Sequence, residues 1–281
     1  MRKTIKSLYE GVGFSYLVTV AKEKDTSQRK LAKAIAQGFL SAGIHFAPAS
    51  MSGYNACSFS TPGCRASCLT FAGQGGIGLD ENNINFVQKA RIARTKLFFE
   101  QRGRFWEIFH YEMERFLNYA RKRNLTPTFR PNITSDIPWE RIPVGYETRD
   151  NMFQAYPLLQ FMDYTAFPLH TRKSIPDNYH LTFSLKETNL DQALFELQSG
   201  NANVAVPFFV NRTKPLPEVW NGFPVLDGDK HDLRFLDKPG HVVGLRVKGH
   251  LARRDTTGFI VDPNQTTEPN LLIGSSKLSN R

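Results

Sequence analysis

The chain has 281 residues, of which 41% are hydrophobic, and its formal net charge is +10. A chain of this length and composition can bury a core, so it is not a disordered segment. No apolar run reaches the roughly 18 residues that a membrane-spanning helix needs, and residues 1–6 lack the apolar stretch of a secretory signal. We therefore expect a cytoplasmic protein without membrane contact.

The positive net charge predicts an anionic partner, either a small molecule or a nucleic acid. The basic residues concentrate in residues 2–33 and 89–123. A basic surface that only keeps the protein dissolved is the alternative interpretation.

The first half of the chain predicts a strand over residues 13–20 and a helix over residues 27–42, where apolar residues recur at helical spacing. Residues 82–123 predict two long helices that are broken near Gly103. We interpret residues 1–45 as an N-terminal extension.

From residue 128 onward, short apolar runs alternate with helix-like segments. The predicted strands cover residues 128–131, 159–164, 179–185, 203–210, 223–226 and 241–247, and the helix-like segments cover residues 150–158, 167–175 and 189–198. This alternation predicts βαβ units and hence an α/β fold, with a mostly parallel sheet that is open or forms a partial (β/α) barrel. The α/β domain, with the cysteines at its start, spans residues 46–262, and a polar tail covers residues 263–281.

All three cysteines of the chain, Cys57, Cys64 and Cys68, lie in residues 57–68, which we call the cysteine loop. Cys64 and Cys68 would share one face of a short helix, and Pro62-Gly63 provides the turn that brings Cys57 back to them. An odd number of cysteines cannot form a closed set of disulfides. Three interpretations stay open: an iron–sulfur cluster, with 4Fe–4S as the leading form; a zinc ion with a fourth ligand such as His45; and metal-free thiols.

Polar residues follow the predicted strands at the points where these end. They are Asn132, Ser135, Asp136, Asp163, Ser184, Lys186 and Arg212. The carboxyl ends of parallel strands meet at one edge of a sheet, so we expect these residues to form a mouth that opens onto the cysteines. Asp136, Asp163 and Lys186 are the predicted catalytic residues, and the other four are predicted to bind a cofactor. Each could instead be an ordinary turn or capping residue.

Two further motifs carry weaker signals. Residues 73–78 fit the G-x-G-x-x-G pattern of dinucleotide sites, but no apolar strand precedes them, so we interpret them as a loop. Asp227, Asp229 and Asp232 could hold a hard divalent cation, although an Asp-Gly turn is the favoured interpretation of the first two.

Several sequence blocks point to a known family. They are Pro-Gly-Cys-Arg-Ala-Ser-Cys at residues 62–68, Ala-Arg-Ile-Ala-Arg-Thr at residues 90–95, Ser-Asp-Ile-Pro-Trp-Glu at residues 135–140, Asp-Tyr-Thr at residues 163–165 and Asn-Tyr-His-Leu-Thr-Phe-Ser at residues 178–184. On these blocks the chain resembles the bacteriophage gene product 88 family over about residues 45–262. The resemblance implies a phage or prophage origin, and thus the host cytoplasm, but no activity.

A second resemblance is to radical S-adenosylmethionine enzymes. In that family three cysteines near the start of a partial (β/α) barrel hold a four-iron cluster, and its fourth iron binds the methionine moiety of S-adenosylmethionine. The order of cysteines and predicted strands in this chain is similar. The spacing differs, since six and three residues separate the cysteines here instead of three and two, and the family's Gly-Gly-Glu motif is absent.

The leading interpretation is therefore an iron–sulfur enzyme of phage type, with its cluster on Cys57, Cys64 and Cys68, S-adenosylmethionine as candidate cofactor and an unknown substrate. The alternative is a basic, zinc-containing phage accessory protein whose residues 89–123 bind nucleic acid. A third interpretation is an inhibitor that acts on a host protein.

Overall fold

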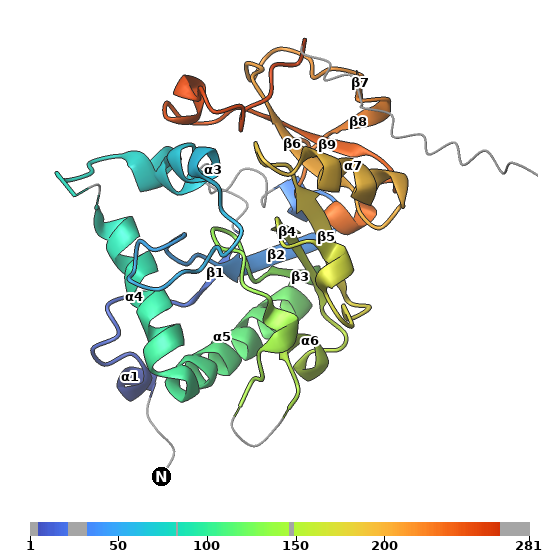
Figure 1. Ribbon diagram of the computed structural model, residues 1–281. Coiled ribbons are helices and arrows are strands. Elements are labelled where there is room, and N and C mark those ends of the chain that lie inside the picture. The colour runs from blue at the N-terminus through green and yellow to red at the C-terminus, as the bar shows by residue number, and fades with distance from the viewer. Residues whose placement is uncertain (1–4, 22–32, 83, 146–148, 265–281) are drawn as a thin grey trace, which may run out of the picture.

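The protein is described by a computed structural model, which places residues 5–21, 33–82, 84–145 and 149–264 (Figure 1). A nine-stranded sheet forms the centre of this part of the chain. In spatial order the strands are β1 (Val18–Val20), β2 (Phe39–Ile44), β3 (Thr126–Arg130), β4 (Gln160–Thr165), β5 (Tyr179–Ser184), β6 (Val204–Phe208), β9 (Val242–Arg246), β8 (Phe223–Asp227) and β7 (Val219–Trp220).

The strands from β2 to β6 lie side by side in chain order and are parallel, as are the next two, β9 and β8. Only the outermost strands, β1 and β7, pair antiparallel with their neighbours. The sheet is open rather than closed, so the predicted α/β fold with an open, mostly parallel sheet is confirmed. The parallel strands deliver their carboxyl ends to one side of the sheet, which we call the carboxyl edge.

Helices connect the parallel strands. The α-helices are α1 (Ile5–Leu8), α3 (Pro62–Ala66), α4 (Phe86–Glu100), α5 (Arg102–Lys122), α6 (Met152–Ala155) and α7 (Leu190–Gln198). Short 3-10 helices are η2 (Leu69–Phe71), η3 (Gly73–Gly76), η4 (Trp139–Arg141), η5 (Leu169–Thr171), η6 (Arg234–Leu236) and η7 (Ala252–Arg254). Helix α5 packs against β3 and β1, and α7 packs against β5 and β6 (Figure 1).

Local sequence explains the two long helices. The Asn85 side chain caps α4 by accepting a hydrogen bond from the Gln88 N–H at 2.9 Å. The chain breaks at Gln101, close to the predicted break at Gly103, and α5 then buries apolar side chains at helical spacing against Phe129 of β3. The buried set on α5 includes Phe105, Ile108, Phe109, Met113 and Phe116.

Aromatic side chains join the helices to the segments that follow β2 and β3. Phe46, Phe98 and Phe105 surround the Trp139 ring, with ring centroids 4.9–6.2 Å from it. Each of these side chains is almost fully buried. Burial of one large apolar side chain contributes about 2–3 kcal/mol, so this cluster is a main source of stability for the side of the sheet that faces α5.

The predicted helix over residues 27–42 is wrong at its end. Residues 22–32 lie outside the described part, but Phe39–Ile44 form β2, the first parallel strand. Gly38 has a φ of +83°, which ends the preceding turn, and β2 then lies between β1 and β3 with nearly every residue buried. A strand buried on both faces has no alternation of apolar and polar residues, so its pattern is easily taken for a helix.

Other boundaries shift as well. The predicted strand over residues 13–20 shortens to β1, and the helix-like segment over residues 167–175 contains only η5, which starts directly after Pro168. Strand β2 belongs to the sheet although it falls in the predicted N-terminal extension. The boundaries proposed at residues 45 and 262 stay predictions, and most of the predicted polar tail lies outside the described residues. No helix in the described ranges has the length and apolar character needed to cross a membrane.

Glu112 of α5 fastens the N-terminal segment to this core. Its carboxylate accepts hydrogen bonds from the Leu17 N–H at 2.7 Å, the Val18 N–H at 2.6 Å and the Tyr9 hydroxyl. Burial raises the pKa of Glu112, while these hydrogen bonds act in the opposite direction. One half-buried carboxylate thus satisfies the backbone donors at the start of β1.

We expect Glu112→Ala to lower the free energy of unfolding by about 3 kcal/mol, because it leaves three donors without their charged acceptor. Urea denaturation measures the change. Glu114→Ala, on the same helix but exposed, removes the same charge and should change stability by less than about 0.5 kcal/mol. Equal losses in the two variants would contradict this assignment.

Candidate functional site

The cysteine loop follows β2 and lies at the carboxyl edge of the sheet. The Lys186 Nζ, two residues beyond the end of β5, donates a hydrogen bond to the Cys64 Sγ at 3.2 Å. Cys57 forms an isolated parallel bridge with Asp136, which follows the end of β3. Contacts from two strand ends therefore hold the loop in place.

Helix α3 presents Cys64 from this loop. Thr61 caps the helix and Pro62 occupies its first turn. The Glu187 carboxylate accepts hydrogen bonds from the Thr61 hydroxyl at 2.5 Å and from the Gly63 N–H at 2.6 Å. Because β5 ends at Ser184, neighbouring residues Lys186 and Glu187 both reach the loop instead of pointing to opposite faces.

A segment from the C-terminal part of the chain packs over α3. A Cβ atom at Gly63 would lie 2.0 Å from the Thr257 Oγ1 and 2.9 Å from the Phe259 Cβ, so only glycine fits there. The Lys186 Nζ lies 5.1 Å from the centroid of the Phe259 ring. This segment is paired with the end of β6 through a bridge between Phe208 and Val261.

The other end of the loop is held through Asp136. Its carboxylate accepts hydrogen bonds from the Thr165 hydroxyl at 2.7 Å and the Ala166 N–H at 2.8 Å, and it lies 3.8 Å from the Arg172 guanidinium. Arg172 is buried and also forms an ion pair with Glu140 at 3.1 Å. Asp136 therefore positions the backbone that pairs with Cys57.

The three thiols lie close enough that the ionisation of one affects the others. Burial raises the pKa of Cys57 to about 12, and the neighbouring Asp136, Cys68 and Cys64 raise it further. Burial also raises the pKa of Cys68, while Lys186 and Arg91 oppose the shift. Without a metal, Cys57 and Cys68 are therefore neutral thiols at pH 7.

No group of three or more His, Cys, Asp or Glu side chains in the described ranges has the geometry to hold one metal ion. His45, the predicted fourth zinc ligand, lies within hydrogen-bonding distance of the Thr19 hydroxyl, with its Nδ1 3.3 Å from the Oγ1. Burial lowers the pKa of His45, and Arg91, Arg94 and Arg130 lower it further. The ligand set expected for zinc is thus not assembled.

Three of the predicted site residues make their hydrogen bonds with one another and with the core, away from the cysteine side chains. Asp163, Asn132 and Ser135 form a buried network with Tyr179, in which Asp163 accepts hydrogen bonds from the Asn132 side chain at 3.0 Å and the Tyr179 hydroxyl at 2.8 Å. Burial raises the pKa of Asp163 to about 7. Arg212 is exposed in the segment after β6.

Of the predicted set, Asp136 and Lys186 contact the cysteine loop through the bridge and the hydrogen bond described above. Ser184, the last residue of β5, is half-buried, and its carbonyl accepts a hydrogen bond from the Asn189 side chain at 3.1 Å. Sequence reasoning missed Glu187, Arg172 and Arg91 as residues around the loop. The position of Glu187 next to Lys186, three residues after the end of β5, was the one signal that could have identified it.

Ion pairs occupy the aspartates considered for a divalent cation. Asp229 pairs with Arg246 at 3.3 Å and with Lys248 at 2.8 Å, and Asp232 pairs with Arg130. The N–H of Asp229 donates to the Asp227 carboxylate at 2.9 Å, so Asp227-Gly228-Asp229 is a turn. The glycine-rich residues 73–78 are loop and short 3-10 helix, as expected, and the Gln88 side chain holds them through the Gly75 carbonyl at 2.8 Å.

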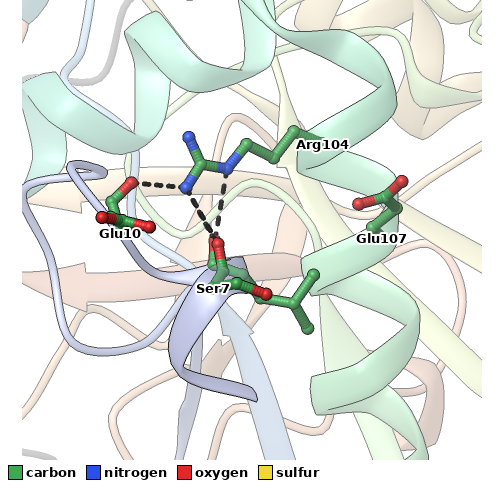
Figure 2. Close-up of a pocket in the computed structure, with 5 residues that line it drawn as sticks. Ser7, Glu10, Arg104 and Glu107 are labelled. Carbon is green, nitrogen blue, oxygen red and sulfur yellow. Dashed lines mark hydrogen bonds between the residues drawn. The ribbon is translucent and has the colours of Figure 1, made fainter. Parts of the chain in front are cut away.

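A surface pocket of about 480 Å³ lies between α1 and α5, in the lower part of Figure 1, whereas α3 lies in its upper part (Figures 1 and 2). Ser7, Leu8, Glu10, Arg104 and Glu107 line it. The Arg104 guanidinium donates to the Leu8 carbonyl at 3.1 Å and also to the Glu10 carbonyl (Figure 2). Arg104 thus fastens the N-terminal segment, and the pocket is separate from the cysteines.

These features define an α/β protein whose three cysteines gather at the carboxyl edge of an open, mostly parallel sheet. The chain belongs to the gene product 88 family, whose family model matches residues 18–263. Searches of curated proteins and of solved structures gave no match, so neither supports the resemblance to radical S-adenosylmethionine enzymes.

We predict slow alkylation of Cys57 in the metal-free protein, because only the thiolate reacts and the raised pKa keeps the thiol protonated. The rate with iodoacetamide, followed by mass spectrometry, should keep rising with pH to beyond about pH 10. A synthetic peptide of residues 57–68 is the control, and its rate should level off near the ordinary thiol pKa of about 8.5. A plateau at the same pH in both would show that burial does not perturb Cys57.

Proposed function

We propose that the protein is an iron–sulfur enzyme whose cluster is bound by Cys57, Cys64 and Cys68. The observation that carries the proposal is the position of the cysteine loop at the edge where parallel α/β sheets bind their ligands, where Lys186 contacts Cys64 and Asp136 pairs with Cys57. A structural thiol needs no such position. Three cysteine ligands also leave one iron of a four-iron cluster open for a substrate or cofactor.

The lack of a single-ion site among the described residues argues against a zinc ion. A single ion needs its ligands close enough to share one coordination sphere, and the described residues contain no such group. A cluster spaces its thiolates farther apart, because iron and sulfide lie between them. Both kinds of metal group require the thiols to lose their protons on binding.

The chain's own residues would serve three roles around this group. Glu187 and Asp136 fix the two ends of the loop through the contacts described above. Lys186, half-buried beside Cys64, supplies a positive charge that favours an anionic substrate. The Phe259 segment covers α3 and limits the access of water.

S-Adenosylmethionine is the cofactor that we propose for the open position. The supporting feature is the order of the chain: the cysteine loop follows the first parallel strand, and β3 to β6 come next in sequential order. A change in the cluster's electron paramagnetic resonance spectrum when S-adenosylmethionine is added would support this step. An unchanged spectrum together with no binding in equilibrium dialysis would remove it and leave the cluster proposal intact.

We expect protein purified without oxygen to contain iron and sulfide in equal amounts and to absorb visible light. Cys64→Ala should lose most of both, because a ligand is missing, while Ser58→Ala in the same loop should keep them. Metal and sulfide analysis with visible spectroscopy makes the measurement. Stoichiometric zinc, or wild-type protein free of metal, would contradict the proposal.

The alternative is a nucleic-acid-binding protein. Arg121, Lys122 and Arg123 are exposed side by side at the end of α5, next to the exposed Tyr119. However, much of the predicted basic stretch serves the fold, since Arg91 and Arg94 are buried and Arg104 binds backbone carbonyls. The candidate contact surface is therefore smaller than the sequence suggested.

On this alternative, the affinity for duplex DNA should fall steeply with salt, because each neutralised phosphate releases bound counterions. Arg121→Gln/Lys122→Gln should reduce the slope of log K against log salt concentration by about two. Lys230→Gln/Lys238→Gln, which removes two exposed charges elsewhere, should leave the slope unchanged. Fluorescence anisotropy measures both, and absence of binding at low salt would eliminate the alternative.

A further inference from the structure

Helix α4 turns a polar face toward the segment that follows the cysteine loop. Gln88, Arg91 and Thr95 recur at helical spacing on this face, and all are buried. Gln88 donates to the Thr70 carbonyl at 2.8 Å, and the Arg91 Nη1 donates to the same carbonyl at 2.9 Å. Thr70 lies two residues after Cys68, so Arg91 is fixed beside the last cysteine.

Arg91 carries a buried charge without a carboxylate partner. Its side chain is only 9% exposed, and its Nε has no hydrogen-bond partner among the described residues. The other buried arginines each have an acidic neighbour: Arg94 has Glu112, Arg172 has Glu140, and Arg234 has Asp237. In the described ranges, no carboxylate lies within ion-pair distance of Arg91.

The ionisable group next to the Arg91 anchor along the chain is Cys68, two residues before Thr70, whose carbonyl and hydroxyl both accept hydrogen bonds from Arg91. Burial lowers the pKa of Arg91 to about 10, Arg94 lowers it further, and Cys68 acts in the opposite direction. An unpaired buried cation is costly, so a fold that keeps one normally supplies an anion to it. The thiolate of Cys68, and an anionic group bound by the three cysteines, would be that anion.

We propose that Arg91 is the counter-cation of the cysteine site, neutralising the thiolates and the metal group that they hold. This inference rests on the proposed iron–sulfur function and adds a positioning residue to it. A fixed positive charge near a cluster stabilises the reduced, more negative state more than the oxidised one. Arg91 should therefore raise the reduction potential of the cluster and strengthen its retention.

The test compares Arg91→Gln, Arg91→Lys and Thr70→Val with the wild type, all purified without oxygen. Arg91→Gln should have a lower reduction potential in a redox titration followed by electron paramagnetic resonance. It should also bind the metal group about tenfold more weakly, the lower end of the effect of substitutions around metal ligands. Arg91→Lys keeps the charge and should restore most of the potential.

Thr70→Val separates charge from structure, because it removes the hydroxyl that Arg91 binds but keeps the guanidinium. Its potential should stay near that of the wild type. Two results would overturn the inference and leave the proposed function standing. One is a cluster in Arg91→Gln with the same reduction potential as in the wild type. The other is a Thr70→Val variant whose reduction potential shifts as much as that of Arg91→Gln. Wild-type protein without iron and sulfide would overturn the proposed function, and the inference with it.

Discussion

The carboxylate of Glu187 joins the cysteine loop to the sheet, and the arrangement of the site depends on this contact. It binds the Thr61 hydroxyl and the Gly63 N–H at the start of α3, where backbone donors have no partner within the helix. Hydrogen bonds to a charged acceptor are stronger than neutral ones, so one side chain can fix a helix of five residues. Since Lys186 precedes Glu187 in the chain, the same contact brings the ammonium group to Cys64.

The outline of the fold could be predicted from periodicity, and the exceptions have physical causes. The strands β3 to β6 and the helices α4 and α5 appear near their predicted positions, because apolar runs and helical spacing dominate those segments. Strand β2 was taken for part of a helix, since both of its faces are buried. Strand β9 lies between β6 and β8, so the strand order here departs from chain order, and no local sequence pattern encodes such an order.

The candidate site was harder to predict than the fold. Sequence order indicates which residues follow a strand, but not the direction in which the side chains point after it ends. Asp163 lies within β4 and faces Asn132 and Tyr179 in the core, whereas Lys186 lies beyond β5 and reaches the cysteines. Arg91 was counted among surface basic residues, because a helix with a polar buried face has no clear apolar stripe in its sequence.

Burial acts in opposite directions on the two kinds of charged group at this site. It raises the pKa values of Cys57 and Cys68, which disfavours their thiolates, and it lowers the pKa of Arg91, which disfavours its cation. No carboxylate among the described residues pairs with Arg91, but an ionised Cys68 and the Arg91 cation would each lower the burial cost of the other. Binding of the proposed metal group would remove the thiol protons, so it would convert a neutral thiol beside an uncompensated cation into a compensated pair. A fold with only a structural role for its cysteines would gain nothing from keeping that cation, whereas a site that must hold an anionic metal group gains both affinity and a raised reduction potential.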